Sequence, residues 1–180
     1  MDIPTFKYHP DPLATGSIER SEQTCLVCGQ ARGFIYTGAI YAEDDLDDSI
    51  CPWCIADGTA HEKFNAEFVD AAGVGGYGLW EPVPDEIVAE VAYRTPGFTG
   101  WQQEKWFTHC GDAGQFLGRA GHDEISALGP DAIAAIKEEI GFDGEEWDDY
   151  FESLDKDGEP TAYMFKCRHC GAIGGYSDFT

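Results

Sequence analysis

Three C-x-x-C pairs constrain the fold of this chain more than any other feature of its sequence. They are Cys25/Cys28, Cys51/Cys54 and Cys167/Cys170, and a seventh cysteine, Cys110, stands alone. An odd number of cysteines at paired spacing favours metal ligation over a disulfide framework. We therefore expect thiolate clusters that bind metal ions.

The first two pairs form the strongest local signal. They are separated by 22 residues, and together they supply the four soft thiolates that tetrahedral Zn²⁺ requires. Gly29 follows the first pair and can adopt the positive φ that turns backbone amides toward the sulfurs. We predict that Cys25, Cys28, Cys51 and Cys54 hold one structural zinc ion.

The segments around these pairs resemble a treble-clef or zinc-ribbon module. Residues 33–41 are rich in aromatic and β-branched residues with glycine breaks, which predicts a hairpin, and residues 55–64 predict a short helix. A redox reading competes, because Cys51-Pro52-Trp53-Cys54 resembles the dithiol of thioredoxin-like proteins. That fold requires a βαβ unit upstream of the dithiol, and the sequence shows none, so zinc is the favoured interpretation.

The third pair predicts a second metal site. Cys167 and Cys170 lie between strand-like segments 161–165 and 172–176, and Cys110 is the natural third ligand. The fourth ligand is open, with candidates His109, Asp112, His122 and His169. His109 is disfavoured, because two adjacent residues bind one ion only with backbone strain. The alternative is that Cys110 is a small core residue and that the third pair lies in a turn that binds no metal ion.

The rest of the chain predicts helices. Segments beginning at Pro84, Thr99 and Pro130 and a segment over residues 145–154 carry apolar stripes at helical spacing, and Gly141 ends the third. The predicted fold class is α+β, with a zinc module over residues 1–72. Residues 73–180 then form a mainly helical region with a C-terminal β-hairpin that carries the third pair. We expect both parts to pack as one compact unit.

The charge of the chain is strongly negative. Its 34 acidic and 11 basic residues give a formal net charge of −23. Nucleic-acid binding is not expected, because nucleic-acid readers need a basic surface. Acidity either keeps the protein soluble or provides a docking surface for a basic protein. On the 145–154 helix, Trp147 and Tyr150 lie beside the acidic residues and are expected to provide an apolar anchor.

No catalytic group is evident in the sequence. His61-Glu62 begins a metalloprotease motif, but the second histidine that the motif requires is replaced by Asn65. No apolar stretch approaches the roughly 20 residues of a membrane span, and no secretory signal is visible. We expect a non-catalytic, cytoplasmic protein, and the sequence predicts no particular oligomeric state.

Several motifs resemble the CbrC family of bacterial proteins, which have three C-x-x-C motifs. These motifs occupy residues 4–12, 15–17, 32–38, 51–58, 94–98, 100–104, 109–112 and 165–171. The resemblance implies a role in bacterial tolerance of, or immunity to, toxins such as nuclease colicins. Family members often carry a further cysteine four residues after Cys110, where this chain has Gly114. That departure leaves Cys110, Cys167 and Cys170 with a non-cysteine fourth ligand or with none.

The expected function is therefore that of an acidic zinc protein that binds a basic macromolecule such as a nuclease toxin. Two alternatives stay open. One is a zinc-dependent hydrolase that uses an open second site, and the other is a regulatory module that responds to metal supply or oxidation. The number of protein ligands at the second site discriminates between structure and catalysis, because a catalytic zinc keeps one position for water.

Overall fold

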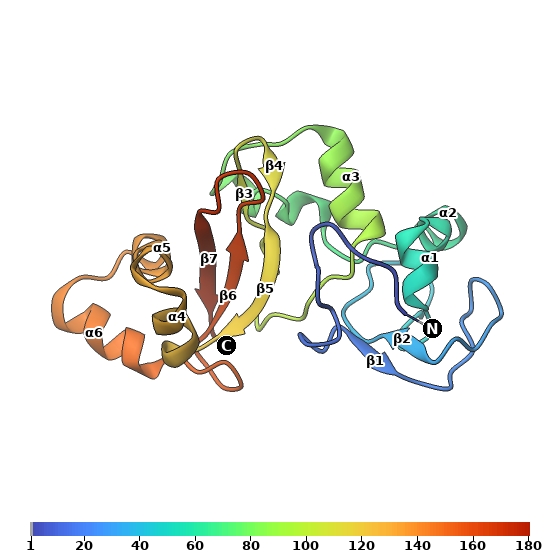
Figure 1. The fold of residues 1–180 in the computed structure, drawn as a ribbon, viewed down its shortest axis with the longest axis horizontal. Helices are drawn as coiled ribbons and strands as arrows, with labels where there is room; N and C mark the ends of the chain where they lie inside the picture. Colours follow the sequence, from blue (N-terminus) through green and yellow to red (C-terminus); the bar gives the residue numbers. More distant parts are fainter. Residues whose placement is uncertain (1) are drawn as a thin grey trace.

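The computed structural model describes residues 2–180 and has the predicted α+β architecture. Figure 1 shows an elongated arrangement in which β1, β2, α1 and α2 lie at one end and α4, α5 and α6 lie at the other. A three-stranded sheet, β5-β6-β7, stands between them. Three buried apolar clusters follow the same order along the molecule.

The N-terminal sheet has two short antiparallel strands, β1 (Ile18–Arg20) and β2 (Phe34–Tyr36). The first C-x-x-C pair lies in the loop between them. The prediction that residues 33–41 fold back on themselves is wrong. All three β2 residues are buried against β1 and the core, and Tyr41 pairs with Glu67 instead.

The helix predicted over residues 55–64 is two helices, α1 (Pro52–Ala56) and α2 (Thr59–Phe64). Pro52 occupies the first turn, where its missing N–H leaves no bond unmade, so α1 begins earlier than predicted. Gly58 has φ +84° and separates the two helices. The early start of α1 places Cys54 in its first turn.

The middle of the chain is less helical than predicted. Two 3-10 turns, η1 (Ala71–Gly73) and η2 (Gly76–Gly78), precede α3 (Asp85–Arg94), which begins after Pro84 as predicted. The helix predicted from Thr99 is wrong, because residues 96–107 form an irregular, extended segment. Trp106 is fully buried there, and its backbone N–H donates to the Gly73 carbonyl at 2.9 Å. Tertiary pairing therefore replaces the helical turn.

The central sheet contains the predicted C-terminal hairpin. Strands β6 (Thr161–Lys166) and β7 (Ile173–Asp178) are antiparallel, and the third C-x-x-C pair lies in their turn. Strand β5 (Gln115–Ala120) pairs with β6 and was not predicted. A small hairpin of β3 (Thr108–His109) and β4 (Asp112–Ala113) precedes it and carries Cys110 in its turn.

Helices cover one side of this sheet. They are α4 (His122–Leu128), α5 (Pro130–Ile140) and α6 (Gly144–Ser153), of which α5 and α6 were predicted. Trp147 is only 7% exposed and packs into the core beside Ile136. Trp147 is therefore not available as the surface anchor expected on α6, whereas Tyr150 is half-buried and its hydroxyl donates to Ser177 Oγ at 2.9 Å. Within residues 2–180, no helix combines the length and apolar character needed to cross a membrane.

Candidate metal centres

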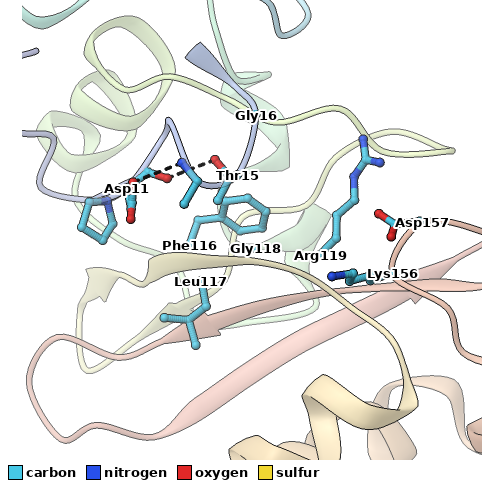
Figure 2. A pocket seen from close by; sticks show the side chains of 11 residues that line it. Asp11, Thr15, Gly16, Phe116, Leu117, Gly118, Arg119, Lys156 and Asp157 are labelled. Carbon is cyan, nitrogen blue, oxygen red and sulfur yellow. Dashed lines mark hydrogen bonds between the residues drawn. The ribbon is translucent and has the colours of Figure 1, made fainter. Parts of the chain in front are cut away.

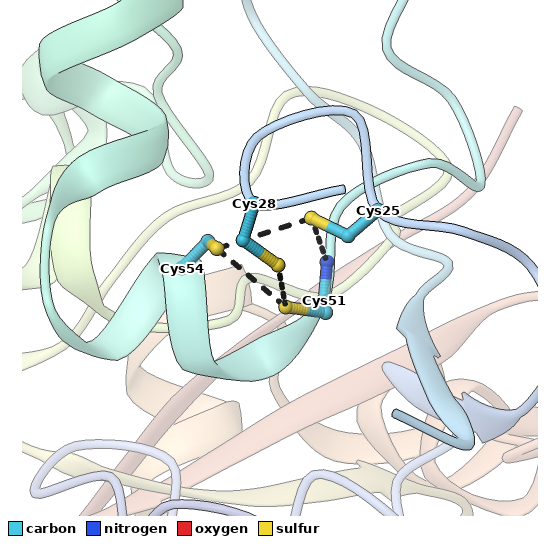
Figure 3. A group of neighbouring side chains, drawn as sticks. All are labelled: Cys25, Cys28, Cys51 and Cys54. Atoms are coloured by element: carbon cyan, nitrogen blue, oxygen red, sulfur yellow. Dashed lines mark hydrogen bonds between the residues drawn. The ribbon is translucent and has the colours of Figure 1, made fainter. Parts of the chain in front are cut away.

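The first candidate metal centre consists of the four predicted cysteines. Cys25 and Cys28 come from the β1–β2 loop, and Cys51 and Cys54 come from the start of α1 (Figure 3). In the loop, the Gly29 N–H donates to the Cys25 carbonyl at 2.8 Å, with Gly29 at φ +69°. At the start of α1, the Cys54 N–H donates to the Cys51 carbonyl at 3.1 Å, so each pair lies in a tight turn.

The spacing of the sulfur atoms fits a tetrahedral ion. The Sγ–Sγ distances are 3.9 Å for Cys25–Cys54, 3.9 Å for Cys28–Cys51 and 3.6 Å for Cys51–Cys54. Zn–S bonds of about 2.3 Å place tetrahedral sulfurs roughly 3.8 Å apart. A disulfide requires about 2.05 Å, so all four thiols are free.

The electrostatics of this centre are compatible with a bound cation. A hydrogen bond with the Cys51 thiol lowers the pKa of Cys25 to about 4, and the same bond raises the pKa of Cys51. One thiol in the group thus ionises easily, but its neighbours resist ionising beside it. Since Cys25, Cys51 and Cys54 are at most 2% exposed, a metal ion is the natural source of compensating charge.

The second candidate centre is built from two hairpin turns. His109 is the last residue of β3 and Cys110 lies in the β3–β4 turn, while Cys167 and Cys170 come from the β6–β7 turn. The Gly171 N–H donates to the Cys167 carbonyl at 3.1 Å, which repeats the turn seen at Gly29 in the first centre. Burial would raise the pKa of Cys167, but backbone N–H groups in this turn lower it to about 6.

His109 supplies the fourth donor atom of this group, although the sequence disfavoured it. Its Nδ1 lies 3.2 Å from Cys110 Sγ and 3.4 Å from Cys170 Sγ, and the two sulfurs are 3.7 Å apart. Tetrahedral zinc gives N–S separations of roughly 3.5 Å. The strain anticipated for adjacent ligands is present, since Cys110 has φ +56° in the left-handed region.

The other three candidates for the fourth ligand lie outside this group. Asp112 accepts hydrogen bonds from Tyr8 at 2.7 Å, Arg168 at 2.7 Å and His169 at 2.9 Å. Burial would raise the pKa of Asp112, but these donors lower it on balance. His169 is thereby engaged with Asp112, and His122 lies on α4 beside Asp123.

Glu81 supports the second centre, and its role was not predicted. Its carboxylate accepts from the backbone N–H groups of Cys110 at 2.9 Å and Gly111 at 3.3 Å. Its carbonyl accepts from the Thr108 hydroxyl at 2.6 Å. Glu81 therefore holds the β3–β4 turn in its left-handed conformation. No sequence pattern links it to Cys110, which lies 29 residues away.

The two centres differ in exposure. In the first, three sulfurs are buried and Cys28 is half-buried, whereas in the second Cys110 and Cys170 are exposed. Cys167 alone is buried in the second group, at 2% exposure. The first centre belongs to the core of its module, and the second lies at the surface of the sheet.

Comparison with known proteins assigns the family. A family model described as "Uncharacterised protein family (UPF0167)" matches residues 3–179. This chain belongs to the UPF0167 family. It is 47% identical to a UPF0167 protein of Mycobacterium tuberculosis over 98% of this chain and 94% of that protein. It is 44% identical to one of Pseudomonas aeruginosa over 99% and 98%. No solved structure matches the chain.

Gly114 occupies the position at which the sequence analysis considered a further cysteine ligand. A Cβ atom at Gly114 would lie 2.9 Å from a ring carbon of Phe107 and 3.3 Å from Phe165 Cβ. The space that a cysteine side chain would need is thus filled by aromatic packing. The fourth donor atom of the second centre comes instead from His109.

A surface cavity of about 550 Å³ lies apart from both centres (Figure 2). It lies between the loop around Thr15 and strand β5. Its charged lining residues are two bases, Arg119 and Lys156, and two acids, Asp11 and Asp157. Because these charges balance, the cavity does not select a ligand by charge.

Proposed function

We propose that this protein binds two zinc ions and acts, without catalysis, as an acidic docking module for a basic protein. The observation that carries the proposal is the pair of four-donor groups whose donor atoms all lie within 4.8 Å of one another. Sulfur-rich tetrahedral sites of the S₄ and S₃N type suit Zn²⁺ among the common metals. The cytoplasm would keep these thiols reduced and able to bind it.

The absence of catalysis is inferred from ligand number. A catalytic zinc is held by three protein ligands and keeps one position for water or substrate. Each group here offers four protein donors. The alternative, a zinc hydrolase at the second centre, would require His109 to leave the ion during turnover.

The proposed partner follows from charge and from resemblance. A net charge of −23 favours association with a basic surface and disfavours phosphate backbones. The resemblance to the CbrC family suggests a basic nuclease toxin such as a nuclease colicin, and hence a role in toxin tolerance. A regulatory role for the second centre is the other candidate, because two of its thiols are exposed.

Metal content tests the zinc part of the proposal. We expect two equivalents of zinc per chain by elemental analysis of protein purified without added metal. Cys167→Ser should hold one equivalent, because it removes only a ligand of the second centre. Less than half an equivalent in the wild-type protein, with all seven thiols reactive, would contradict the proposal.

A further inference from the structure

The second centre presents a pair of accessible sulfurs to solvent. Cys110 and Cys170 are exposed, and their Sγ atoms lie 3.7 Å apart. They come from separate hairpin turns, so each can move without unwinding a strand. Reactivity of cysteine toward oxidants follows thiolate character and access, and zinc-bound sulfur is thiolate.

The third sulfur of this centre is protected. Cys167 is 2% exposed, and its thiol contacts the His109 carbonyl oxygen at 3.7 Å. In the first centre only Cys28 is more than 2% exposed, and its Sγ lies 3.9 Å from that of buried Cys51. Two exposed sulfurs in contact therefore occur in the second centre and not in the first.

We propose that Cys110 and Cys170 form a peroxide-sensitive pair that closes to a disulfide and releases the second zinc ion. This inference rests on the proposed function, since it requires zinc at the second centre. One thiolate attacks an oxygen of hydrogen peroxide, which breaks the O–O bond, gives a sulfenic acid and releases hydroxide. The second thiolate attacks that sulfur, forms the S–S bond and expels a second hydroxide. Two electrons pass from the sulfurs to the peroxide.

Zinc release follows from the loss of two ligands. The disulfide leaves His109 and Cys167 as the remaining donors, which is too few for a stable tetrahedral site. The sulfurs need to approach from 3.7 Å to about 2.05 Å. The two turns can provide this movement, because Cys110 and Cys170 are exposed and lie outside the apolar core.

The experiment treats the full-length zinc-loaded protein with hydrogen peroxide and follows released zinc with a chromogenic chelator. We expect one of two equivalents to be released, and peptide mass spectrometry to find a Cys110–Cys170 disulfide. A thiol reductant with added zinc should restore both equivalents. The first centre provides the internal control, because its ion should remain bound.

Two outcomes would overturn the inference in different ways. Retention of both ions, or release from the first centre at the same rate, would reject the peroxide-sensitive pair while leaving two zinc ions in place. A starting protein with one equivalent of zinc would reject the second centre itself, and with it this inference.

Discussion

At the scale of single residues, the second centre depends on the backbone of Cys110. Adjacent metal ligands were disfavoured from the sequence because two neighbouring residues rarely bind one ion without backbone strain. The structure brings them together by giving Cys110 φ +56° and Gly111 φ +68°, and Glu81 accepts from both N–H groups. The backbone strain expected for adjacent ligands is present, but the sequence did not reveal that the distant Glu81 carboxylate stabilises the strained turn.

The three candidate histidines give a direct test of this arrangement. His109→Ala should weaken zinc binding at the second centre by more than the roughly 10–100-fold typical of losing an outer-shell partner. His169→Ala should have a smaller effect, because that ring contacts Asp112 rather than the donor group. His122→Ala is the control and should change nothing. Competition with a chelator of known affinity measures all three, and equal effects for His109 and His122 would contradict the site.

A second residue-scale prediction concerns His9, which is fully buried. Its Nδ1–H donates to the Pro96 carbonyl at 2.7 Å, and the Thr15 hydroxyl donates to Nε2 at 2.6 Å. Burial lowers the pKa of His9 to about 4, although the Pro96 carbonyl and the charge of Asp11 oppose this. Between its unfolded pKa near 6.5 and pH 4, the unfolded chain therefore binds more protons than the folded chain.

Stability should accordingly fall as the pH drops through this window. We expect His9 to account for a loss of about 2 kcal/mol in unfolding free energy between pH 7 and pH 5. His9→Gln keeps a neutral polar side chain and should show a correspondingly flatter pH dependence. Urea unfolding of both proteins at the two pH values measures the difference, and the metal ligands, common to both, cancel. Parallel pH profiles would show that His9 titrates normally.

At the scale of secondary-structure elements, the N-terminal module is built from pieces too short to be stable alone. Its strands β1 and β2 have three residues each, and α1 and α2 have five and six. Isolated hairpins and helices of this length are marginal in water. Three of the four cysteines of the first centre lie in the same buried cluster as these elements. The metal ion is therefore expected to replace part of the missing apolar core.

The first centre is part of the core of the N-terminal module, whereas the second lies at the surface of the sheet. Loss of a cysteine ligand should therefore affect protein stability differently at the two centres. Zinc contributes roughly 10–16 kcal/mol in zinc-finger peptides, which matches or exceeds the stability of a typical domain. Cys28→Ser should therefore unfold the N-terminal module or make the protein insoluble. Cys170→Ser should lose one zinc yet keep the near-ultraviolet circular dichroism of the aromatic cluster around Trp106, Phe116 and Phe165. A Cys28→Ser protein with wild-type melting would show that the first centre is not structural.

Elements were predictable from sequence where local signals agreed with packing. Helix α5 begins at Pro130 and ends before Gly141, as its start and stop residues indicate. Strand β5 escaped prediction because small residues, Gly118 and Ala120, fill two of its three buried positions and the apolar Leu117 is exposed, so its sequence shows no apolar-polar alternation. The false helix at Thr99 had a plausible cap, but the backbone of Trp106 pairs with Gly73 of η1 and with Gly75. This second miss comes from long-range contacts that no local window contains.

At the scale of the whole molecule, the dominant property is charge. Two exposed acidic groups stand out, one formed by Asp44, Asp45, Asp47 and Asp48, and the other by Glu145, Glu146, Asp148 and Asp149. The first lies between β2 and α1 and the second on α6, and these elements occupy opposite ends of the molecule (Figure 1). Exposed charges are screened beyond about 8 Å at physiological ionic strength, so the two groups act independently.

A basic partner should therefore use one acidic group and not the other. Because Trp147 is buried and Tyr150 is half-buried, little of the apolar anchor expected from sequence is exposed, and we expect steering by charge to be the main contribution. Stopped-flow mixing with a basic colicin nuclease domain should show association that slows sharply as salt rises, while dissociation changes less. Changing four acids to amides at the docking group should reproduce the effect of salt, and the same change at the other group is the matched control.

If acidity serves solubility alone, both variants will bind as the wild type does and differ only in aggregation. An association rate that ignores salt and both sets of substitutions would reject the docking module.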